Sequence, residues 1–223
     1  MLPNSRNLTK IYDRLYGFYG PQHWWPGDTR FEIMVGAILT QNTAWSNVEK
    51  AIRNLKEKGA LSSPRKIKDM PKRDLARLIR PSGYYNIKSG RLKNLINFLI
   101  SRYEGDLNRA AKRAGDCLRE ELLGVNGVGK ETCDSILLYA FKRPFFVVDA
   151  YTKRIFSRHG FVKEADAYDR VQEIFMNNLP RDHELYNEYH ALIVRLGKEL
   201  CRKRNPKCGV CPLNGIQRKI RTF

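Results

Sequence analysis

Apolar residues recur at three- and four-residue spacing along nearly the whole chain. One stripe, Phe31, Met34, Val35, Ile38 and Leu39, is dense enough to predict a helix buried on most sides. Sparser stripes occupy 11–18, 48–55, 75–79, 92–99, 136–141, 151–156, 171–175 and 192–200. No segment alternates apolar and polar residues as a strand does, and no repeat of roughly 20–50 residues occurs. The pattern predicts an all-α protein of about ten helices joined by short loops.

Two segments interrupt the helical pattern. In 23–28 the adjacent residues Trp24 and Trp25 precede Pro26, and one helical face cannot bury two adjacent indoles, so a loop is expected. The segment 124–130 contains three glycines and lies between two predicted helices. Its composition indicates a tight turn.

Charge then narrows the class of partner. The chain of 223 residues has 41 Lys and Arg against 23 Asp and Glu, a net charge of +18 and a pI of about 9.9. This excess of positive charge favours a polyanion as the binding partner, because each phosphate that the protein neutralises releases counterions. A basic surface without such a partner is the alternative. No apolar run approaches the roughly 18 residues of a membrane span, and the N-terminus lacks a signal-peptide core. We expect a cytoplasmic protein that does not contact membranes.

The glycine turn and one aspartate are the first candidates for chemistry. Glycines at 127 and 129 permit positive φ and let backbone N–H groups approach a phosphate, although a turn that only packs two helices would look the same. Asp149 follows the apolar pair Val147 and Val148 directly before a predicted helix. From residue chemistry alone, helix capping explains this aspartate more simply than catalysis.

Several motifs in order resemble one family. They are the segments 36–43, 83–88 and 125–132, the aspartate at 149, and the C-terminal cysteines. Together they resemble the endonuclease III superfamily of helix–hairpin–helix DNA glycosylases over most of the chain. The resemblance implies a two-lobed all-α fold. Residues 28–139 would form a helical barrel that includes the hairpin, and 1–27 with 140–223 would form a second lobe that carries Asp149 and the cysteine loop.

The resemblance also implies roles for individual residues. Asp149 would stabilise the positive charge that develops on the sugar as the base leaves. A DNA phosphate would be held by Gly127, Val128, Gly129 and Lys130. Gln41 matches the residue that fills the gap left by a flipped base, and a helix-terminal hydrogen bond is its alternative role.

Position 131 separates two kinds of glycosylase. Bifunctional members carry a lysine directly before the threonine of the second hairpin helix, and that lysine forms a Schiff base with the sugar. Here the position holds Glu131, and Lys130 lies about 100° away around a helix. We therefore expect a monofunctional enzyme that uses water and needs no cofactor for its chemistry.

Aromatic residues predict the substrate class. The segments 24–26, 39–43, 80–86 and 129–132 together resemble the 3-methyladenine DNA glycosylase III branch. The expected base pocket consists of Trp24, Trp25, Pro26, Trp45 and Glu131. A cationic alkylated purine stacks well on indoles, and its glycosidic bond is already weakened. We expect a monomer that excises alkylated purines such as 3-methyladenine from double-stranded DNA in a bacterial or archaeal cell. Core packing is the alternative for the tryptophans.

Two rival functions stay open. One is an endonuclease III-like glycosylase and AP lyase for oxidised or mismatched bases, with another amine as the nucleophile. The other is a non-catalytic module that binds the DNA backbone, in which Asp149 only caps a helix.

The cysteines form a separate pattern. Cys201, Cys208 and Cys211 match the first three ligands of the family's [4Fe–4S] loop, but the fourth position is Gln217. Four thiolates are the usual complement, so an incomplete cluster and the remnant of a lost site are both open. The isolated Cys117 and Cys133 are expected to be buried.

Overall fold

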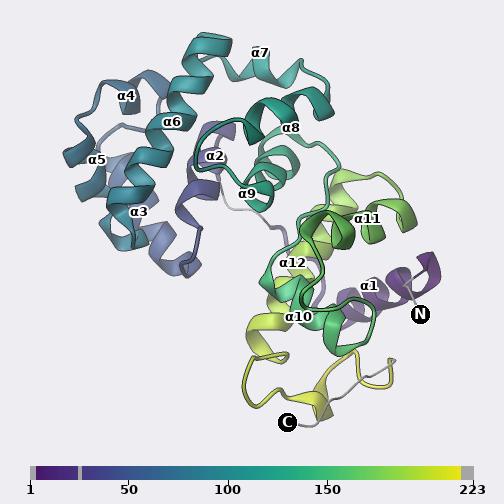
Figure 1. Ribbon diagram of the computed structural model, residues 1–223. Helices are drawn as coiled ribbons and strands as arrows, with labels where there is room; N and C mark the ends of the chain where they lie inside the picture. The colour runs from purple at the N-terminus through teal and green to yellow at the C-terminus, as the bar shows by residue number, and fades with distance from the viewer. Residues whose placement is uncertain (1–3, 25–26, 217–223) are drawn as a thin grey trace. The chain divides into compact units, whose positions relative to one another are not determined.

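The computed structural model describes residues 4–24 and 27–216. All regular structure in these ranges is helical, which confirms the predicted fold class (Figure 1). The chain divides into two compact units: a terminal unit, Met1–Trp24 with Pro144–Phe223, and a central unit, Trp25–Arg143. The predicted barrel over 28–139 falls within the central unit. In the described ranges, no helix combines the length and apolarity needed to cross a membrane.

The central unit is built around its longest helix, α6 (Tyr85–Tyr103), which packs against α2, α4, α5 and α7. The dense apolar stripe becomes α2 (Arg30–Leu39), and its buried residues confirm a helix covered on most sides. The other elements are α3 (Trp45–Glu57), α4 (Pro64–Asp69), α5 (Lys72–Leu78), the 3-10 turn η1 (Arg80–Ser82), α7 (Leu107–Ala111), α8 (Gly115–Leu123), α9 (Lys130–Ser135) and the π-helical turn η2 (Ile136–Ala140).

The terminal unit joins the two ends of the chain. Its elements are α1 (Ser5–Tyr19), α10 (Ala150–Arg158), α11 (Tyr168–Asn178), α12 (His183–Glu199) and the 3-10 turn η3 (Cys208–Val210). Helix α12 packs against both α10 and α1, so the first helix lies beside the later ones in Figure 1. The Tyr189 hydroxyl donates to the Leu8 carbonyl at 2.9 Å, and the Phe146 and Phe175 rings stack at 3.9 Å beside it. This buried aromatic cluster is what holds α1 in the unit.

One expectation about the cysteines is wrong. Cys133 is fully buried, as predicted, but Cys117 is exposed. Helix α8 turns Leu118 and Leu122 toward the core, and Cys117 lies on the other face of that helix. The exposure of Cys117 is therefore set by the face of α8 on which it lies, and not by the hydrophobicity of its thiol.

A buried lysine on α6 connects three elements of the central unit. Lys88 is 1% exposed, and its Nζ donates to the carbonyls of Leu39 at 2.8 Å and Ser82 at 2.7 Å. The ammonium therefore satisfies the end of α2 and the end of η1 together, where helix carbonyls favour a cation. Burial, assisted by the nearby charge of Arg91, lowers the pKa of Lys88 to about 8.

This lysine predicts a pH-dependent stability. The ordinary pKa is 10.5, so between about pH 8 and 10.5 the unfolded chain binds one proton more than the folded chain. The contribution of Lys88 to the free energy of unfolding should rise with pH by about 1.4 kcal/mol per unit in this window, and be lost as pH falls through the folded pKa. Urea unfolding of the wild type and of Lys88→Met across this range measures it. Parallel pH profiles for the two proteins would contradict the prediction.

Candidate active site

The glycine turn between α8 and α9 is pressed against α6. Gly127 has φ +97°, and a Cβ at this position would lie 2.3 Å from Cγ of Arg91. Asn94, one turn further along α6, donates from Nδ2 to the Asn126 carbonyl at 3.0 Å. Only glycine satisfies both the positive φ and the close approach at 127.

The next glycine has a different role. Gly129, the N-cap of α9, has φ −87°, which any residue can adopt, and no described atom lies within 4 Å of a Cβ built there. It therefore leaves open space beside the first N–H groups of α9, which lack partners within the helix. These groups can donate to a phosphate. Val128 is buried beneath the turn, whereas Lys130 is exposed beside it.

An ion pair joins the two hairpin helices. Arg119 on α8 donates from Nε and a terminal nitrogen to the two carboxylate oxygens of Asp134 on α9, at 2.7 and 3.1 Å. Asp134 is fully buried. Removing either partner would leave a buried charge unpaired, so the pair fixes how the helices meet.

Gln41 is bonded to the hairpin. Its Nε2 donates to the Gly127 carbonyl at 3.0 Å and to the Thr132 hydroxyl at 2.9 Å, and its Oε1 accepts a hydrogen bond from Arg91. The helix-terminal hydrogen bonds considered from sequence are therefore present. Filling a gap in DNA would require exchanging these bonds, and that role stays a prediction.

The predicted pocket residues are distributed over both units. In the central unit, Trp45 begins α3 half-buried and donates to Glu49 at 2.9 Å, and Glu131 is exposed in the first turn of α9, where the helix dipole favours a carboxylate. In the terminal unit, Trp24 is half-buried, with Nζ of Lys198 at 5.5 Å from its ring centroid. Trp25 and Pro26 lie outside the described residues. The two described indoles are less buried than the core.

Asp149 is the N-cap of α10, as the sequence predicts. Its Oδ1 accepts from the Thr152 N–H at 2.7 Å and from the Thr152 hydroxyl at 2.9 Å. Capping thus uses one carboxylate oxygen. The other, Oδ2, lies 3.6 Å from Nε2 of His190 on α12, within ion-pair distance.

His190 is the residue that sequence reasoning missed. No motif marks it in the sequence, and only the packing of α10 on α12 places it beside Asp149. Burial raises the pKa of the Asp149 carboxyl, but the His190 imidazole and the two Thr152 donors together lower it by more. The net pKa is below its ordinary value, so Asp149 is a carboxylate at neutral pH.

The C-terminal cysteine loop is held by arginines from α10. Arg154 donates to the carbonyls of Cys201 and Gly197, each at 2.9 Å. Arg158 donates to Sγ of Cys201 at 3.3 Å and to the Arg202 carbonyl at 2.7 Å. These bonds hold the start of the loop against α10.

A four-thiolate cluster does not fit this loop. Among the described residues, no three cysteine, histidine or acidic side chains are arranged to hold a metal ion. Cys208 is exposed and Cys211 half-buried, and the fourth position of the motif is Gln217. Three thiols are one short of the usual set. No step of the reaction is therefore assigned to a cluster.

The central unit has a glycine hairpin that exposes backbone N–H groups, and the terminal unit has a largely buried carboxylate at the N-terminus of α10. A phosphate-binding turn and a carboxylate that can stabilise positive charge are the groups expected of a helix–hairpin–helix DNA glycosylase. Comparison with known families agrees. Residues 35–181 match the HhH-GPD superfamily of base excision DNA repair proteins, and 201–216 match the iron-sulfur binding domain of endonuclease III. The chain belongs to the HhH-GPD superfamily and is a DNA glycosylase of base excision repair.

Individual relatives support the same class. The chain is 54% identical over 208 residues to MJ1434, a candidate DNA repair glycosylase of Methanocaldococcus jannaschii, covering 92% of this chain and 93% of that one. It is 32% identical to endonuclease III of Thermotoga maritima, covering 81% and 79%. A non-covalent endonuclease III–DNA complex superposes with a TM-score of 0.83 at 25% identity, covering 98% and 96%. An H. pylori 3-methyladenine DNA glycosylase bound to 1,N6-ethenoadenine gives 0.76 at 29%, covering 88% and 98%.

Substitutions of the two hairpin glycines should have opposite effects on stability and on DNA binding. Gly127→Ala should lower the free energy of unfolding by about 1–3 kcal/mol, because the residue is strained at positive φ and collides with Arg91. Gly129→Ala should leave stability within about 0.5 kcal/mol but weaken DNA binding, because its methyl group occupies the open space. Urea unfolding and fluorescence anisotropy with labelled duplex separate the effects. Undiminished DNA affinity for Gly129→Ala would remove the phosphate site from this turn.

Proposed function

We propose that the protein is a monofunctional glycosylase that hydrolyses the N-glycosidic bond of alkylated purines such as 3-methyladenine in double-stranded DNA. The observation that carries the proposal is Glu131, a carboxylate where bifunctional enzymes need an amine. A glutamate cannot form an imine, so water is the nucleophile. The proposal includes a monomeric enzyme that acts in the cytoplasm and needs no cofactor for this step.

The substrate class follows from charge and stacking. Trp24 and Trp45 are half-buried and Glu131 is exposed, so part of each side chain lies at the surface of its unit. An indole face and a carboxylate both favour a cationic purine over a neutral one. The H. pylori relative, which is named a 3-methyladenine DNA glycosylase and holds a modified purine, supports the same class.

The proposed reaction uses few protein groups. The C1′–N bond breaks with its electron pair moving to the cationic purine, which leaves as a neutral base without needing an acid. The sugar becomes an oxocarbenium-like cation, which the Asp149 carboxylate stabilises. Water then attacks C1′, and its proton passes to Asp149.

The alternative is an endonuclease III-like glycosylase with lyase activity. The endonuclease III relatives favour it, and the exposed Lys130 next to Glu131 is an amine at the start of α9. Such an enzyme forms an imine that borohydride traps on abasic DNA. The proposed monofunctional enzyme gives no trapped product.

Asp149→Asn tests the proposed chemistry without removing the cap. Asparagine is as good an N-cap as aspartate, so stability should stay within about 0.5 kcal/mol of wild type. Loss of the negative charge should slow base release about a thousandfold or more. Chromatography of bases released from methylated duplex DNA, with wild type and variant, measures it. Release of no alkylated purine, or a trapped imine, would overturn the proposed function, and a fully active variant would leave Asp149 as a cap only.

His190 is predicted to position the catalytic carboxylate. His190→Leu removes the group that faces Oδ2 and should lower kcat about tenfold with little change in KM, whereas His190→Gln places an amide N–H near the same point and should restore much of the rate. The neighbouring Tyr189→Phe, which loses only the bond to Leu8, is the control for damage to α12. An unchanged kcat in His190→Leu would show that His190 only packs.

A further inference from the structure

The surface of the central unit has an open depression of about 590 Å³, called the cavity below, whose lining residues do not include the hairpin. It is formed by α5, η1 and the first turns of α6. Four cations line it, Lys72, Arg73, Arg77 and Arg80, together with the polar side chains of Tyr85 and Asn86, and no lining residue is acidic. Its volume falls within the roughly 300–1,000 Å³ typical of ligand clefts, but its charge selects an anion rather than an apolar molecule.

Nearby carboxylates balance little of this positive charge. Arg77 pairs with Asp74 at 3.6 Å, on the exposed surface of α5. Within the described ranges, no carboxylate lies within 4 Å of Lys72, Arg73 or Arg80. Gathering like charges costs free energy, and a bound anion offsets that cost.

The backbone at the start of α6 also presents positive partial charge to the cavity. Gly83 at φ +67° and Tyr84 at φ +45° reverse the chain between η1 and α6, and a left-handed tyrosine is a strained conformation typical of functional sites. Tyr84 is left 67% exposed. Among the described residues, no side chain caps α6, so the first N–H groups of this 19-residue helix and its positive dipole end border the cavity.

We propose that this cavity binds backbone phosphates of DNA, as a second phosphate-binding site besides the hairpin. Four cations exceed the charge of a single phosphate, which is about −2 at most, and suit consecutive phosphodiesters of one strand. Side chains on α5 and η1 would carry the charge, and the first turn of α6 would add neutral donors. The site rests on the DNA binding of the family and does not depend on which base is excised.

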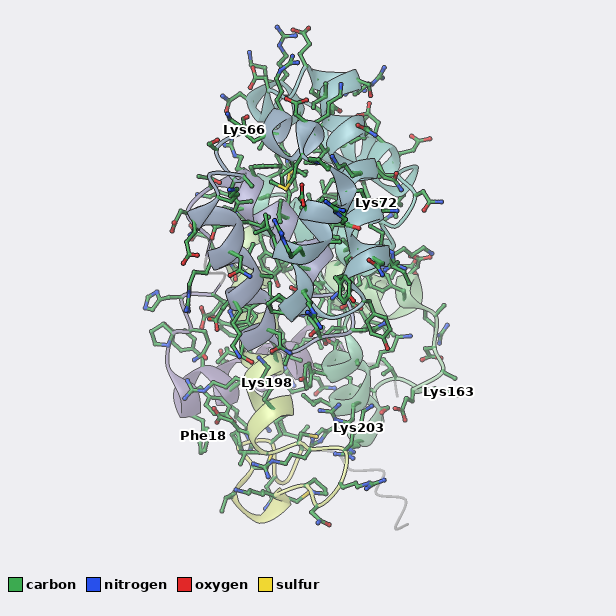
Figure 2. All side chains as sticks on the ribbon, turned by 90° about the vertical axis from the view of Figure 1, so that its left-hand side faces the viewer. Phe18, Lys66, Lys72, Lys163, Lys198 and Lys203 are labelled. Carbon is green, nitrogen blue, oxygen red and sulfur yellow. The ribbon has the colours of Figure 1, made fainter. Side chains whose placement is uncertain are left out.

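The salt dependence of DNA binding tests the site. A cavity variant, Lys72→Gln with Arg73→Gln and Arg80→Gln, is compared with a control variant of equal charge, Arg65→Gln with Lys66→Gln and Lys68→Gln on α4. Figure 2 shows Lys66 and Lys72 at separate places on the central unit. Affinity for an undamaged duplex, measured over a range of salt, should show a log–log slope about 2–3 units shallower for the cavity variant and nearly unchanged for the control. Base release at saturating enzyme should be unaltered, because no catalytic group is touched.

Two results would contradict the proposed site. Equal slopes for the two variants would mean that only total charge matters. If inorganic phosphate raises the melting temperature of wild type but not of the cavity variant, and the DNA slope is unchanged, the cavity binds a small anion instead. Should the triple variant unfold, the single variant Arg73→Gln is used, with an expected slope change of about 1 against Lys66→Gln. Undamaged duplex keeps this test independent of any failure to release alkylated bases.

Discussion

One polar stripe on α6 holds the end of α2, the Gln41 side chain and the hairpin turn in place. Lys88, Arg91 and Asn94 follow one another at three-residue spacing, so their side chains emerge on neighbouring parts of the helix surface. They donate to the end of α2, to the amide of Gln41 and to the turn of the hairpin, respectively. Loops distant in sequence thus share a single rigid support. The glycine at 127 is required because this support approaches the turn so closely.

The terminal unit shows how a capping residue can also be the proposed catalyst. Asp149 accepts both Thr152 hydrogen bonds on one oxygen, and these bonds fix the carboxylate at the start of α10. The second oxygen is turned toward His190, away from the capping task. Capping and catalysis therefore do not compete for the same atom. The two interpretations that the sequence leaves open are compatible, since the cap orients the charge that the chemistry needs.

Local features of this fold were predictable from sequence, and non-local ones were not. Helical periodicity, the cap at Asp149 and the existence of a tight turn at 124–130 depend on residues within a turn or two of each other. The burial of Lys88, the approach of His190 to Asp149 and the cation-lined cavity depend on how separate helices pack, and no spacing encodes that. Exposure of Cys117 was mispredicted for a related reason, because residue type alone does not say which face of a short helix is covered. The resemblance supplied roles for the motifs but not these contacts.

On the proposed function, the distribution of charge explains how a protein with a net charge of +18 can still favour a cationic base. Lys130 lies exposed at the hairpin and four cations line the α5 cavity, the two places where we propose that phosphates bind. Phosphate contacts are indifferent to sequence and damage. On the proposed function, the carboxylates of Asp149 and Glu131 act only on a flipped nucleotide, whose base and sugar carry the developing positive charge. Neutral bases gain little from these carboxylates, and their glycosidic bonds are not weakened. Affinity and selectivity therefore come from charges of opposite sign, which is why removing cations should change the salt slope while removing the Asp149 charge changes the rate.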